Sequence, residues 1–64
     1  MRTNLTVKDE EKRRKGFAVV RQSVDPQWTK WAVIYPDSAK RNTEWHDEEY
    51  LALNAADLFN GRNL

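Results

Sequence analysis

The stretch from Trp28 to Tyr35, Trp-Thr-Lys-Trp-Ala-Val-Ile-Tyr, constrains the fold more than any other part of the sequence. It is rich in aromatic and β-branched residues, and its one charge is Lys30. These residue types favour a pleated, half-buried backbone, so we expect a β-strand. Alternate residues of a strand point to opposite faces, which separates Lys30 from Trp31. Since neither face is polar, either both faces are covered or one of them binds a partner.

Two further strands are expected on either side of this one. The first runs from Phe17 to Val24 and is joined to the central strand by Asp25-Pro26-Gln27. Asp followed by Pro is typical of a type I turn, and a short turn between two strands predicts an antiparallel hairpin. A polar turn over residues 36–42 then leads to a short third strand over residues 43–46.

The C-terminal part of the chain has the composition and period of an amphipathic helix. Asp47 is a suitable N-cap, and Asn60-Gly61 provides a stop signal. The apolar positions recur at helical spacing, which predicts one face that packs against the sheet. These positions are Leu51, Ala55, Leu58 and Phe59, flanked by two further alanines.

The expected fold class is therefore α+β, with a three-stranded antiparallel β-sheet packed against one C-terminal α-helix. This unit occupies residues 16–64 as a single domain. The sequence leaves open which face of the sheet the helix covers. One alternative places Ala32 and Ile34 under the helix, and the other places Trp31 and Tyr35 there.

Residues 1–15 are expected to form a charged N-terminal arm that is flexible or marginally helical. Thr6 and Asp9 match the start signal of a helix, and Gly16 would end it. However, residues 8–15 are all charged, so such a helix has no apolar face to bury.

Composition excludes several classes of function. The chain has 64 residues, no Cys, one His and a net charge of +1. Without Cys there is no disulfide and no thiolate metal site, and His46 beside acidic residues at a helix start is more typical of capping than of catalysis. We therefore expect no metal, no cofactor and no enzymatic activity. The absence of a long apolar run or signal peptide predicts a cytoplasmic protein without a membrane partner.

Basic and aromatic residues on the expected strands and turns are the candidates for nucleic-acid contact. Cations bind phosphates, and side chains that extend from a sheet can reach into a groove. The candidates are Arg13, Arg14 and Lys15 in the arm, Arg21, Lys30 and Trp31 on or near the sheet, and Lys40 and Arg41 in the second turn.

Short motifs along residues 16–61 are similar to those of a known family. They are Val20-Arg21-Gln22, Lys30-Trp31-Ala32, Trp45, Glu48-Glu49, Ala55-Ala56 and Asn60-Gly61. In this layout the chain resembles the AP2-type DNA-binding domain and the arm-binding domains of phage and transposon integrases. The resemblance implies a sheet that lies in the major groove, with Arg and Trp side chains reaching DNA.

Two functions follow as expectations. The first is a small, non-enzymatic DNA-binding accessory protein of a phage or other mobile element, which binds through the sheet face and the basic arm. The alternative is a protein-protein interaction module, such as an inhibitor or adaptor of a host protein, which uses the aromatic sheet face or a strand edge. Either protein could be a monomer or a homodimer.

Overall fold

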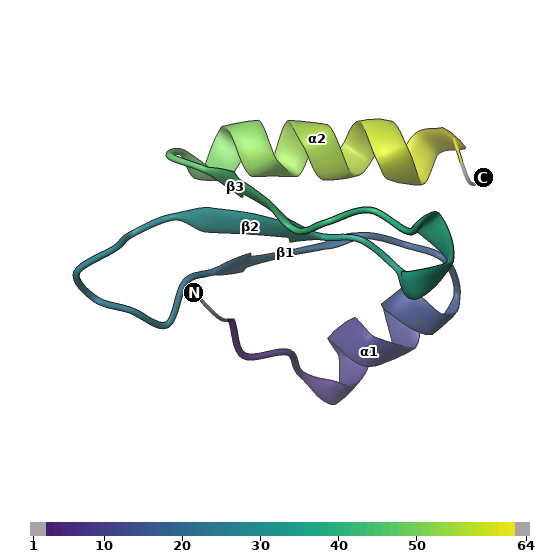
Figure 1. Cartoon of the computed structure of the whole chain (residues 1–64). Helices are drawn as coiled ribbons and strands as arrows, with labels where there is room; N and C mark the ends of the chain where they lie inside the picture. Colours follow the sequence, from purple (N-terminus) through teal and green to yellow (C-terminus); the bar gives the residue numbers. More distant parts are fainter. Residues whose placement is uncertain (1–2, 63–64) are drawn as a thin grey trace.

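The computed structural model describes residues 3–62 of the chain. Figure 1 shows a sheet with one long helix on one side and a short helix on the other. Within the described residues, no helix is both long and apolar enough to cross a membrane. The elements in chain order are α1 (Val7–Arg14), β1 (Val19–Gln22), β2 (Trp31–Ile34), the 3-10 turn η1 (Asp37–Ala39), β3 (Glu44–His46) and α2 (Glu49–Arg62).

The sheet confirms the expected antiparallel order β1-β2-β3. In the β1–β2 hairpin, the backbone N–H of Gln27 donates to the side chain of Asp25 at 2.9 Å, which stabilises the predicted turn. The paired segments are shorter than the apolar stretches in the sequence. Trp28, for example, lies before β2 and packs edge-on against Trp45, with 4.8 Å between the ring centroids.

The helix α2 covers the face of the sheet that carries Trp31, Val33 and Tyr35, which settles the alternative left open by the sequence. Val33 and the alanines Ala52 and Ala56 of α2 are almost fully buried there. Because alanine side chains are short, the helix backbone can approach the sheet closely. Larger side chains pack at the edge of this helix–sheet interface, where the ring centroids of Tyr35 and Phe59 are 5.0 Å apart.

The rotation of α2 about its axis differs from the expectation. Leu58 is 69% exposed and Leu51 is 40% exposed, so these two leucines do not form the packing face. The expected end of the helix is also wrong, because α2 continues through Asn60 and Gly61 to Arg62. The side chain of Asn60 instead bonds both the N–H and the C=O of Ala18, at 2.7 and 3.1 Å.

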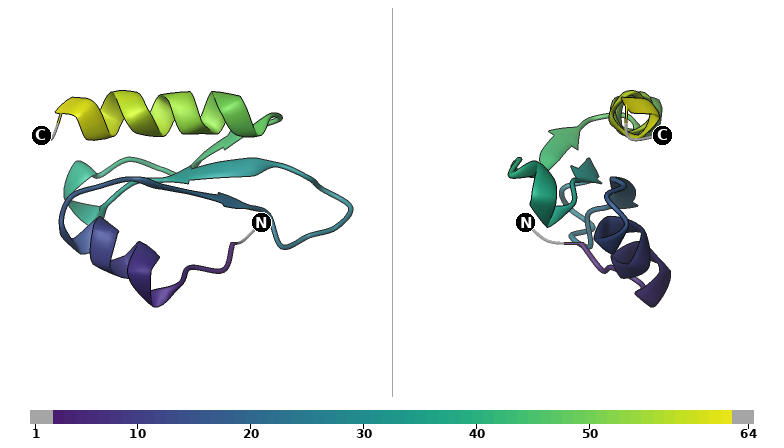
Figure 2. Two further views of the ribbon diagram at one scale, coloured as in Figure 1. Left: turned by 180° about the vertical axis from the view of Figure 1, so that it is seen from behind. Right: turned by 90° about the vertical axis from the view of Figure 1, so that its right-hand side faces the viewer.

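The opposite face of the sheet is covered by the N-terminal segment, so the fold has three layers (Figure 2). Val19, Ala32 and Ile34 form a second apolar cluster there, and Leu5 and Trp45 pack against it. The sequence did not predict this contact. It explains why the central strand is apolar on both faces, as each of them is covered.

The arm, of which Met1 and Arg2 lie outside the described residues, contains the short helix α1. Its start has the capping box expected from the sequence: the Thr6 hydroxyl accepts the N–H of Asp9 at 3.1 Å, and the Asp9 carboxylate accepts the N–H of Thr6 at 3.0 Å. The helix ends at Arg14 with Lys15 as its C-cap, and the chain then turns at Gly16, where φ is +95°, a conformation that glycine adopts without strain. Capping and docking onto the sheet thus order a segment that has no apolar face.

Candidate nucleic-acid interface

Arg21 and Trp31, the candidates on the sheet itself, point to opposite faces. Trp31 packs half-buried in the core under α2. Arg21 lies opposite Ala32 on the other face, where its guanidinium bonds the carboxylate of Asp9 on α1. Neither side chain is free to enter a groove. In this arrangement α2 covers one face of the sheet, and the N-terminal segment with α1 covers the other, so no open sheet face is left for DNA among the described residues.

The Asp9–Arg21 pair is electrostatically favourable for both partners. The hydrogen bond from Arg21 holds the pKa of Asp9 below its ordinary value, and the bonds from Thr6 add to this effect, although burial opposes it. The bond to Asp9 raises the pKa of Arg21. Both groups therefore stay charged and paired, and Arg21 acts in this structure as an anchor for α1.

Lys30 is held at the end of the molecule where the β1–β2 loop and the start of α2 lie together (Figure 1). Its ammonium group donates to the carboxylate of Asp47 and lies 5.9 Å from the ring centroid of Trp28. The bond from Lys30 lowers the pKa of Asp47. This candidate is thus neutralised locally and is separated from the other basic residues.

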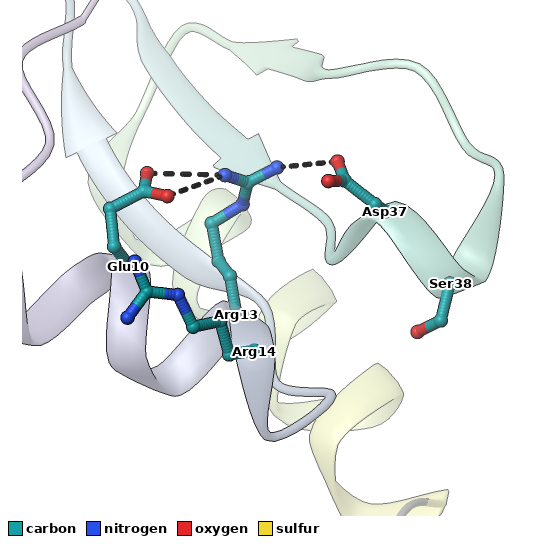
Figure 3. Close-up of a pocket in the computed structure, with 5 residues that line it drawn as sticks. All are labelled: Glu10, Arg13, Arg14, Asp37 and Ser38. Atoms are coloured by element: carbon teal, nitrogen blue, oxygen red, sulfur yellow. Dashed lines mark hydrogen bonds and ion pairs between the residues drawn. The ribbon is translucent and has the colours of Figure 1, made fainter.

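Arg13 has a structural role between α1 and the η1 turn (Figure 3). Its guanidinium donates to the backbone oxygen of Tyr35 at 3.2 Å, to Glu10 at 3.2 Å and to Asp37 at 3.1 Å. Its side chain is 19% exposed. Glu10, Arg13 and Asp37 line a shallow hollow between α1 and η1, and the neighbouring Arg14 lines it too. The guanidinium of Arg14 points away from Asp37.

The remaining basic candidates converge at the end of the molecule where α1, η1 and the C-terminal part of α2 meet (Figure 1). Lys15 and Arg41 line one shallow hollow beside Phe59, and Lys12 and Lys15 line a second beside Phe17. We call this cluster the basic end. Its members are Lys12, Arg14, Lys15, Lys40 and Arg41, all of them exposed.

Four of the five cations in the basic end have no ion-pair partner among residues 3–62. They are Lys12, Arg14, Lys15 and Lys40. The fifth, Arg41, pairs with Glu44 at 2.9 Å and stacks over the ring of Tyr35 at 4.1 Å. Of the candidates chosen from the sequence, the fold thus groups Arg14, Lys15, Lys40 and Arg41. Lys12, which belongs to the charged stretch 8–15, joins them from the helix that carries Arg14.

The opposite end of the molecule is acidic. Asp47, Glu48 and Glu49 lie at the start of α2, and Asp25 lies in the neighbouring β1–β2 loop. The chain has a net charge of only +1, but four cations without an ion pair in the described part of the chain lie at the basic end, whereas Asp25, Glu48, Glu49 and the Lys30–Asp47 pair lie at the opposite end. Such a separation orients a molecule in the field of a charged partner even when the net charge is small.

A polar network beside the β3 edge was not predicted from the sequence. Glu44 accepts hydrogen bonds from the hydroxyl of Tyr35 at 2.8 Å and from Arg41 at 2.9 Å. The bond from Tyr35 is the main cause that lowers the pKa of Glu44, while burial and Glu44 together raise the pKa of Tyr35. The imidazole Nε2 of His46 lies 3.5 Å from Glu44 and is buried without a hydrogen bond.

The described residues contain no group of three or more His, Cys, Asp or Glu side chains that could hold a metal ion. No protein-family model matches the chain, and searches of curated proteins and of solved structures find no match either. The resemblance to AP2-type domains therefore depends on the sequence motifs alone.

Proposed function

We propose that this chain is a small, non-enzymatic DNA-binding protein that holds the phosphate backbone with its basic end. The observation that carries the proposal is the convergence of cations from two separate segments, residues 12–15 and 40–41, at one end of the molecule. Because four of these cations have no ion pair within residues 3–62, phosphates can bind them without breaking an internal contact.

The physical driving force is the release of counterions from DNA. Each phosphate that a Lys or Arg neutralises releases part of the condensed counterion layer, so affinity falls steeply as salt concentration rises. The acidic start of α2 is repelled by the same phosphates. The separation of charge therefore favours one orientation, with the basic end toward DNA and the acidic end away from it.

Contacts with phosphates position a protein but carry no sequence information. The side chains best suited to base contact, Arg21 and Trp31, are engaged with Asp9 and with the core under α2. We therefore expect the chain to bind DNA with little dependence on base sequence, in keeping with an accessory role for a phage or other mobile element.

The test is an amide chemical-shift titration with a short duplex of random sequence, repeated at several salt concentrations. We expect the largest shifts at residues 12–17 and 38–41, and we expect them to weaken with salt. A lack of response at low salt would refute DNA binding, because even non-specific binders respond there.

A pair of matched variants locates the surface. Lys15→Gln removes a free cation at the centre of the basic end, whereas Lys8→Gln removes an exposed cation from the first turn of the same helix. Loss of one phosphate contact should reduce the slope of log K against log salt by about 1 for Lys15→Gln. The slope for Lys8→Gln should stay at the wild-type value. Equal slopes in both variants would place the DNA surface elsewhere.

A second function, binding to another protein, is favoured by one specific observation. The leucines of α2, Leu51, Leu53 and Leu58, are 40–69% exposed, and Leu58 lies beside the outer strand β3.

A further inference from the structure

The helix α2 places its alanines and Phe59 toward the sheet and its leucines toward solvent. It buries Ala52 and Ala56, while Leu51 and Leu58 are 40% and 69% exposed. With Ala55, the two leucines follow the i, i+4, i+7 spacing of a single helix face. We call these three residues the leucine stripe. An amphipathic helix normally buries its largest apolar residues, so the stripe indicates a surface that a partner covers.

The leucine stripe lies beside the edge of the sheet formed by β3. Ala55 and Leu58 line a hollow together with Arg41 and Glu44, which are just before and within β3. β3 pairs with β2 on one side only, so its outer backbone groups are available to another strand. The other edge is different, because the side chain of Asn60 already bonds the backbone of the residue just before β1.

We propose that the leucine stripe and the β3 edge bind a second copy of this chain, with the two β3 strands paired antiparallel about a two-fold axis at Trp45. The pairing would join two three-stranded sheets into one sheet of six strands. The two leucine stripes would then face each other above the junction. A two-fold contact of this kind closes on itself and produces a dimer, not a fibre.

The sequence of β3 is complementary to itself in this register. With Trp45 opposite the partner's Trp45, each Glu44 lies opposite a His46, so an acid faces a base at both positions. An axis through Glu44 would instead oppose two carboxylates, and an axis through His46 would oppose two imidazoles. Like charges directly opposite each other in a sheet destabilise it, whereas opposite charges and aromatic pairs stabilise it.

The charges at the two ends of the molecule favour the same antiparallel arrangement. The segment just before β3 carries Lys40 and Arg41, and the segment just after it carries Asp47, Glu48 and Glu49. Antiparallel pairing of β3 brings the basic segment of each copy beside the acidic segment of the other. A parallel arrangement would instead bring like charges together. Charge complementarity therefore identifies a second copy as the occupant of this surface.

The dimer also compensates for a small core. The almost fully buried apolar residues of the monomer are mainly Ala and Val, and a domain of this size buries only about 60% of its unfolded surface.

Because the axis is perpendicular to the sheet, both copies of α1 lie on the same face of the dimer. Lys12 and Lys15 lie beside Ala18 near the β1 edge, away from the junction, so in the dimer they carry the phosphate contacts, while Lys40 and Arg41 lie beside the partner's acidic segment.

The test compares two leucines on opposite flanks of α2. Leu58→Lys changes the leucine stripe, and Leu53→Lys changes the flank beside β1, where Leu53 is 44% exposed. Sedimentation equilibrium at about 100 µM should give twice the 7.6 kDa chain mass for wild type and for Leu53→Lys. It should give the monomer mass for Leu58→Lys. A monomeric wild type at this concentration, or dissociation caused by Leu53→Lys and not by Leu58→Lys, would overturn the proposal.

Circular dichroism checks that each variant is folded, and Leu51→Lys provides a second change in the leucine stripe.

The register of the β3–β3 pairing is tested separately with Thr43→Cys and Asp47→Cys, since the natural chain has no Cys and both positions are exposed. With the axis at Trp45, position 43 of one copy lies near position 47 of the other. A mixture of the two variants should form a disulfide-linked heterodimer in larger yield than either variant alone. Preferential linking of Thr43→Cys to itself would refute the register.

Discussion

Asp9 of α1 and Arg21 of β1 form a bidentate ion pair, with Asp9 Oδ2 2.6 Å from Arg21 Nε and Asp9 Oδ1 2.8 Å from Arg21 Nη2. Asp9 is 4% exposed, and the same carboxylate accepts the backbone N–H of Thr6. One side chain therefore both caps the first turn of α1 and attaches that helix to the sheet. This explains how a helix without an apolar face holds a fixed position over the second apolar cluster.

The first prediction concerns the stability that Asp9 provides. Asp9→Ala removes the acceptor of the capping box, worth about 1 kcal/mol, and a half-exposed ion pair worth at most about 1 kcal/mol. We expect the free energy of unfolding, measured with urea, to fall by about 2 kcal/mol in total. Glu11→Ala changes an exposed carboxylate of the same helix and should alter it by less than about 0.5 kcal/mol. Equal losses in the two variants would contradict the role of Asp9.

The second prediction is a loss of stability in acid. The pKa of Asp9 is lowered in the folded chain from its ordinary value of 3.8, chiefly by Arg21. The unfolded chain therefore takes up this proton first. The stability contributed by ionised Asp9 is complete at neutral pH and is lost as the pH falls below about 4 toward the folded pKa. Urea midpoints at pH 7 and pH 3 should differ less for Asp9→Asn than for wild type. An identical difference would show that Asp9 is not responsible, since Glu44 also has a lowered pKa.

Local signals in the sequence predicted the local structure correctly. Thr6 and Asp9 form their capping box, Asp25 stabilises its turn, and the apolar stretches form the expected antiparallel sheet. The orientation of α2 could not be predicted in the same way. Leu51, Ala52, Ala55 and Leu58 are all apolar, so helical periodicity alone does not indicate whether the alanines or the leucines face the sheet.

The candidate site shows the same division between local and tertiary information. The cations at 13–15 and 40–41 were visible in the sequence. Their grouping depends on the docking of α1 beside η1, which uses contacts of Arg13 with Tyr35 and Asp37, 22 and 24 residues away. The sequence showed that Arg21 is a basic residue of a strand, but it did not show that Asp9 on α1 is its partner.

The third prediction compares two adjacent residues of α2. Phe59 packs edge-on against Tyr35, whereas Leu58 is 69% exposed. Because Phe59 is only partly buried, Phe59→Ala should cost about 2–3 kcal/mol, below the range for fully buried aromatic residues. Leu58→Ala should cost less than about 1 kcal/mol. Thermal unfolding at low micromolar concentration makes this comparison on the monomer. A larger loss for Leu58→Ala would mean that α2 packs its Leu58 side, and not its Phe59 side, against the sheet.

The fourth prediction uses Lys40, which has φ of +52° in the turn after Tyr35, a turn that contains no glycine. A residue with a β-carbon is strained in this left-handed conformation, so Lys40→Gly should raise the free energy of unfolding by about 0.5–1 kcal/mol. Lys40→Ala removes the same charge but keeps the β-carbon, and it should give no such gain. If the basic end binds DNA, both variants should lose the same affinity at low salt although only one of them is more stable. An affinity that followed stability instead of charge would show that Lys40 acts through the fold and does not contact phosphate.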